Sequence, residues 1–145
     1  MKIHEVKLYQ EFDAPVEKVW EDFNNHATLG TIMGQPMQRI TDSSDPENIN
    51  GLGSVRKIKI PFAPFEETIR KSVKPVCIEY QITKGTPLHH HYGTMQFKSL
   101  SPDKSALDYS IQLGSNFPFV AGLLKSALQN ALETALKKYA ESLKK

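Results

Sequence analysis

Residues 117–145, FPFVAGLLKSALQNALETALKKYAESLKK, form the stretch that decides the fold. Apolar residues recur from Val120 to Leu143 at intervals of three and four, which predicts a long helix with one buried face. Ser115 and Asn116 precede the stretch as candidate N-caps. A one-sided helix of this length needs a large apolar partner, which the rest of the chain must supply.

The expected helix carries two features that bear on a binding site. Ala127, Ala131 and Ala135 alternate with leucines, among them Leu128, so the buried face would be a shallow groove. The groove either leaves space for a small molecule or lets a sheet backbone pack closely. The apolar first turns, residues 117–123, would either form a lid over such a space or lie deep in the core.

Composition limits the class of protein. The chain has 145 residues, with 39% hydrophobic and 23% charged residues, a net charge of +2 and one cysteine. These values describe one globular domain over residues 1–145, with charges too scattered to favour nucleic acid as a partner. No apolar run reaches membrane-spanning length, and residues 1–5 lack the character of a signal peptide. We therefore expect a cytoplasmic protein without stable membrane insertion, a monomer by default and a dimer as the alternative.

Seven segments alternate in the manner of strands, with turn residues between them. One segment comes first, a helix beginning at Pro15 follows it, and a short second helix covers residues 27–33. The expected strands are residues 2–14, 37–42, 54–60, 65–73, 76–82, 91–97 and 107–113. Short connections imply antiparallel neighbours. The sequence thus predicts an α+β protein in which a curved seven-stranded antiparallel sheet wraps around the C-terminal helix.

Three motifs resemble a known family. Asp13–Trp20 (DAPVEKVW) resembles the D-A-P-x-x-x-V-W opening of the polyketide cyclase/dehydrase-like branch of the START-like (SRPBCC) superfamily. Residues 51–56 (GLGSVR) resemble its G-x-G-x-x-R turn, and Glu67 with residues 80–82 (YQI) resembles its E…Y-x-I pair. The resemblance covers essentially the whole chain and implies a helix-grip fold enclosing an elongated cavity. Known members bind lipids, sterols, hormones or polyketides, and a minority are cyclases, so the family implies a cavity rather than a reaction.

Strand alternation selects the residues that would line such a cavity. Arg56 and Glu67 point inward on adjacent strands, either to anchor a polar group of a ligand or to form a structural ion pair. Tyr80 and Tyr109 either contact a ligand or fill the core. The full set expected to bind a ligand is Arg56, Ile58, Glu67, Tyr80, Ile82, His91, Met95, Phe97, Tyr109, Ala127, Leu128 and Ala131.

The run His89-His90-His91 is the most conspicuous local feature. Adjacent strand residues face opposite sides, so the three rings cannot hold one metal ion in an extended chain, and a site with His26 would need a special loop. We expect no metal and no cofactor, with His91 either at the rim or in the cavity, as in the set above, or in solvent like His89 and His90.

No nucleophile, phosphate-binding or zinc-protease motif occurs. The sequence therefore favours binding of a small hydrophobic or amphipathic ligand, lipid-, sterol- or polyketide-like. It leaves open whether the protein is an enzyme of the cyclase or dehydratase type, or a module that regulates a larger protein.

Overall fold

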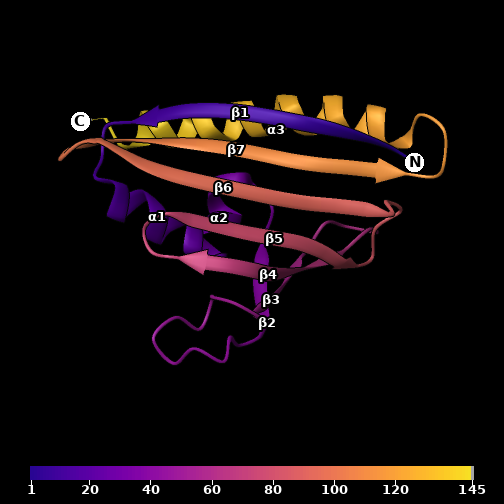
Figure 1. Cartoon of the computed structure of the whole chain (residues 1–145), viewed down its shortest axis with the longest axis horizontal. Coiled ribbons are helices and arrows are strands. Elements are labelled where there is room, and N and C mark those ends of the chain that lie inside the picture. The colour runs from indigo at the N-terminus through magenta and orange to yellow at the C-terminus, as the bar shows by residue number, and fades with distance from the viewer. Residues whose placement is uncertain (145) are drawn as a thin grey trace.

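The computed structural model describes residues 1–144, and the expected helical end at Lys145 lies outside the described residues. The elements follow the predicted order of strand, two helices, six strands and a long helix (Figure 1). They are β1 (Lys2–Phe12), α1 (Val16–Asn24), α2 (His26–Met33), β2 (Met37–Thr41), β3 (Val55–Ile58), β4 (Phe65–Val73), β5 (Cys77–Lys84), β6 (His90–Ser101), β7 (Lys104–Ser115) and α3 (Val120–Ser142).

The strands form one curved antiparallel sheet in the order β1-β7-β6-β5-β4-β3-β2. The first strand therefore pairs with the last, as Lys2 opposite Ser115 and Phe12 opposite Ser105 show. Helix α3 runs along β1 and β7, and its N-terminal end lies near the start of β1 (Figure 1). The predicted α+β helix-grip architecture is confirmed. Within residues 1–144, no helix is long and apolar enough to cross a membrane.

One end of the space between sheet and helices is filled by aromatic rings. Helix α1 buries its apolar stripe, including Phe23, and the ring of Phe23 lies 5.7 Å from that of Phe97 and 5.4 Å from that of Tyr139. Phe12 joins them at 5.3 Å from Tyr139. The hydroxyl of Tyr139 donates to Asp22 at 2.7 Å, which ties the C-terminal end of α3 to α1. This aromatic cluster closes the interior at that end.

Helix α3 departs from the sequence-based expectation in two ways. It begins at Val120, without a side-chain cap, after Phe119 in the left-handed conformation (φ 68°), so Ser115 and Asn116 are not its caps. The alanine stripe also does not form the groove against the sheet, because Ala127 and Ala131 are exposed and Ala135 is half-buried. The partly buried leucines Leu124, Leu128 and Leu132 pack against the core instead.

Candidate functional site

A cavity of about 230 Å³ lies between the sheet, α2 and α3. Nine of the twelve predicted site residues line it: Arg56, Ile58, Glu67, Tyr80, His91, Met95, Tyr109, Leu128 and Ala131. The other three lie elsewhere. Phe97 belongs to the aromatic cluster, Ile82 is half-buried outside the cavity, and Ala127 is exposed one helical turn before Ala131. Ala131 is itself exposed while it lines the cavity, which places it at the mouth.

The strongest electrostatic feature of the wall is the buried ion pair expected from strand alternation. Arg56 and Glu67 face each other in the β3–β4 register, and Arg56 Nε donates to Glu67 Oε1 at 2.8 Å. They are 1% and 6% exposed, respectively, so each charge depends on the other for compensation. The Arg56 guanidinium also lies over the ring of Tyr80, 4.9 Å from its centroid.

His26, considered from the sequence only as a possible metal ligand, extends this pair. His26, the first residue of α2, lies with Nδ1 3.4 Å from Arg56 Nη1 and Nε2 3.0 Å from Ser54 Oγ. Ser54 gives its single hydroxyl proton to the carbonyl of Thr41, so Ser54 Oγ must accept from His26 Nε2–H. His26 Nδ1 then carries a lone pair toward the arginine.

This arrangement keeps His26 neutral. Burial, followed by the charges of Arg56 and Arg39, lowers the pKa of His26 to about 3. Protonation would place an N–H on Nδ1 against the donor Arg56 Nη1. His26 therefore helps to hold the guanidinium. In the sequence, the one signal for it is a histidine directly after the capping residue Asn25.

The two cavity tyrosines form a second polar unit. The hydroxyls of Tyr80 and Tyr109 are hydrogen-bonded to each other, and burial is the largest cause that raises the pKa of both phenols. Gly93 allows the ring of Tyr80 to take this position, because a Cβ on residue 93 would collide with the phenol ring of Tyr80. Gly93 faces Tyr80 in the β5–β6 register, so the ring lies across the bare backbone of β6. Gly93 is not among the residues selected from the sequence, although strand alternation places it on the same face as His91.

The three consecutive histidines separate as the alternation predicts. His91 points into the cavity and is 7% exposed, and its Nδ1 is buried without a hydrogen-bond partner among residues 1–144. Burial, together with the charge of His90, lowers the pKa of His91 to about 4. His90 contacts Gln112, and the ring of His89 lies 5.7 Å from that of Phe117. No group of three potential metal ligands occurs within the described part of the chain.

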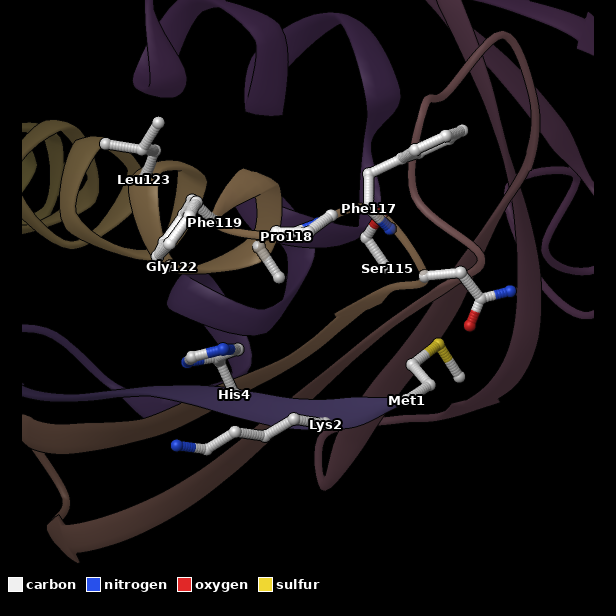
Figure 2. A pocket seen from close by; sticks show the side chains of 11 residues that line it. Met1, Lys2, His4, Ser115, Phe117, Pro118, Phe119, Gly122 and Leu123 are labelled. Atoms are coloured by element: carbon white, nitrogen blue, oxygen red, sulfur yellow. The ribbon is translucent and has the colours of Figure 1, made fainter.

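A second, larger hollow lies on the surface at the N-terminal end of α3. It measures about 640 Å³ and lies between the start of β1, with His4, and the first turn of α3 (Figure 2). Its wall includes Phe117, Phe119 and Leu123, all of which are exposed. Of the segment 117–123, only Ala121 is buried in the core, so most of the first turns lie at the surface. This hollow shares no lining residue with the internal cavity and contains none of the predicted ligand-binding residues.

No family model matches the sequence, and no curated protein matches it. Solved structures do match at the level of the fold. A START superfamily protein from Mycobacterium smegmatis has a TM-score of 0.78 at 13% identity, over 97% of this chain and 99% of that one. The Zhui aromatase/cyclase from a Streptomyces species has a TM-score of 0.74 at 15% identity, over 97% and 94%. Norcoclaurine synthase from Thalictrum flavum, solved with dopamine and hydroxybenzaldehyde, has a TM-score of 0.70 at 14% identity, over 99% and 90%.

These likenesses confirm the START-like, helix-grip resemblance as a resemblance of fold. They extend over nearly the whole chain, whereas the sequence identities are low.

Proposed function

We propose that this protein binds a small, mainly apolar molecule in the cavity between the sheet and α3. The observation that carries the proposal is a cavity of about 230 Å³ where a two-layer protein would normally have a filled core. Most of its remaining wall is apolar, formed by Leu29, Met33, Met37, Ile60, Phe65, Ile111 and Leu132. A few polar groups converge within this apolar surface, which is typical of ligand pockets.

The size of the cavity narrows the ligand class. Pockets for drug-sized ligands measure roughly 300–1,000 Å³, so the ligand that fits here is smaller. One or two fused rings fit better than a sterol or a long lipid. The fold neighbours support the proposal in part, since one is named an aromatase/cyclase and another was solved with two small aromatic compounds.

A pair of alanines on α3 provides the test. Ala131 lines the cavity mouth, and Ala127 lies one turn away outside it, while both are exposed. We expect Ala131→Trp to weaken binding of 2-naphthol, measured by isothermal titration calorimetry, and Ala127→Trp to leave it unchanged. Neither variant should lower the thermal unfolding temperature much, because substitutions at exposed positions change stability little. Equal binding by both variants, or no binding by the unmodified protein, would refute the proposal.

Native mass spectrometry of the freshly purified protein complements this test by looking for a co-purified molecule. Chemical conversion of a bound compound would move the assignment to the cyclase or dehydratase class.

A further inference from the structure

The polar groups of the cavity wall, considered together, carry no net charge. Arg56 and Glu67 neutralise each other through a 2.8 Å hydrogen bond, and the two tyrosines are buried phenols. His91 is neutral near pH 7, because burial lowers its pKa to about 4. A ligand carboxylate entering this cavity would lose its hydration without gaining an unpaired cation, and it would lie close to the carboxylate of Glu67.

The same wall has hydrogen-bonding capacity left over. His91 Nδ1 is buried and has no partner within residues 1–144. Tyr80 and Tyr109 carry two hydroxyl protons, and their mutual hydrogen bond uses one of them. One of the two tyrosines therefore keeps an O–H that is free to donate. Neither hydroxyl makes a second hydrogen bond within the described part of the chain. An unsatisfied buried polar group is costly, so each of these groups favours a ligand that completes it.

These unused groups lie on one side of the cavity. The ring of His91 lies 6.1 Å from that of Tyr80, and the ring of Tyr80 lies 6.4 Å from that of Tyr109. All three line the same cavity, opposite the leucines of α3. A hydroxyl both donates and accepts, so it satisfies a neutral imidazole in either tautomer and also accepts the remaining tyrosine proton.

We propose that the cavity selects neutral ligands that carry a hydroxyl group, bound by His91 and the Tyr80–Tyr109 pair, and rejects carboxylates of the same shape. This inference rests on the proposed function and adds the chemical class of the ligand. A fatty acid or an aromatic acid would be excluded, whereas a phenol or a small cyclic alcohol would be accepted.

Three probes of one shape test the selection: 2-naphthol, naphthalene and 2-naphthoate, each titrated at pH 7 by calorimetry or by ligand fluorescence. We expect 2-naphthol to bind about tenfold more tightly than naphthalene, as one completed hydrogen bond provides. We expect 2-naphthoate to bind at least about a hundredfold more weakly than 2-naphthol, because its charge is buried without compensation.

A His91→Phe variant separates hydrogen bonding from shape. It keeps a ring at this position, so naphthalene should bind as before, while the advantage of 2-naphthol should fall to about threefold or less. Tyr109→Phe provides the second variant should His91→Phe fail to fold, and it should reduce the same advantage. The Ala131→Trp variant shows that each probe occupies the cavity.

The outcomes distinguish the two proposals. If 2-naphthoate binds as tightly as 2-naphthol and Ala131→Trp blocks both, ligand binding stands and the selection for neutral hydroxyl compounds is wrong. The selection is also wrong if His91→Phe and Tyr109→Phe both keep the full preference for 2-naphthol. If none of the three probes binds, both the proposed ligand binding and the proposed selection are wrong.

Discussion

Acidification should destabilise this protein well above the pH at which carboxylates titrate, and two buried histidines are the cause. His26 and His91 are 2% and 7% exposed, with pKa values lowered from 6.5 to about 3 and about 4. The native state therefore holds both rings neutral, whereas the unfolded chain takes up protons as the pH falls below 6.5. The stability that these groups contribute is complete above pH 6.5 and is lost progressively on acidification.

The magnitude follows from the size of the shifts. Each histidine costs about 1.4 kcal/mol per pH unit between its unfolded and folded pKa values. From pH 7 to pH 5, two histidines together lower the free energy of unfolding by about 4 kcal/mol. That loss is a large part of the roughly 5–15 kcal/mol that stabilises a typical domain.

Urea unfolding followed by circular dichroism at pH 7.0, 6.0 and 5.0 measures this loss directly. His26→Gln keeps a donor for Ser54 and removes one titrating group, so its stability should fall about half as steeply with pH as that of the unmodified protein. His89→Gln removes a histidine in an exposed loop, so this control should retain the unmodified slope. Equal slopes for His26→Gln and the unmodified protein would show that His26 is not a buried, neutral group in the native state.

Three further substitutions test the packing of the site. Glu67→Leu should cost about 3–5 kcal/mol in urea unfolding, because it leaves Arg56 buried without a counter-charge, and adding Arg56→Met should recover most of the loss. If Glu67→Leu alone is as stable as the double variant, the two side chains are not energetically coupled and this interpretation of the ion pair is wrong. Gly93→Ala should cost about 1–3 kcal/mol and weaken 2-naphthol binding, since the added methyl displaces the Tyr80 ring; binding at full strength would argue against that placement. Phe119→Gly should raise the free energy of unfolding by up to about 1 kcal/mol. Glycine adopts the left-handed conformation of this position without strain, and the exposed Phe119 side chain contributes few contacts that would be lost. Destabilisation would show that Phe119 packs in solution.

The sequence predicted the helices and strands of this fold because it shows both the two-residue period of strands and the 3.6-residue period of helices. Alternation along β3 and β4 was enough to place Arg56 and Glu67 on the same inner face of adjacent strands, since a strand residue's face follows from its parity, and the structure pairs the two directly. The same parity placed Tyr80, Tyr109 and His91 at the interior. Nine of the twelve predicted residues therefore line one cavity.

The prediction for α3 was wrong about the rotation of the helix around its own axis, which decides which side chains meet the sheet. The 3.6-residue period shows that α3 has an apolar side, but leucines and alanines share it, and the period does not say which stripe meets the sheet. Packing turns Leu128 inward and Ala127 outward. The contact of His26 with Arg56 escaped prediction for a related reason, because it depends on the approach of α2 to β3, which no local pattern records.

The same packing explains why a space remains inside the protein. In the aromatic cluster, rings from the sheet, α1 and α3 meet and fill the interior. Beside it, the long side chains of the sheet make their contacts sideways: Arg56 turns to Glu67 and His26, and Tyr80 lies across Gly93 to reach Tyr109. Side chains that satisfy one another, or that contact His26 of α2, do not extend to α3, so the leucines of α3 face a void. A polar cluster of this kind contributes little net stability compared with apolar residues. Its physical effect here is to keep the interior from closing, and for that reason the Arg56→Met, Glu67→Leu double variant should regain stability and still lose the ligand.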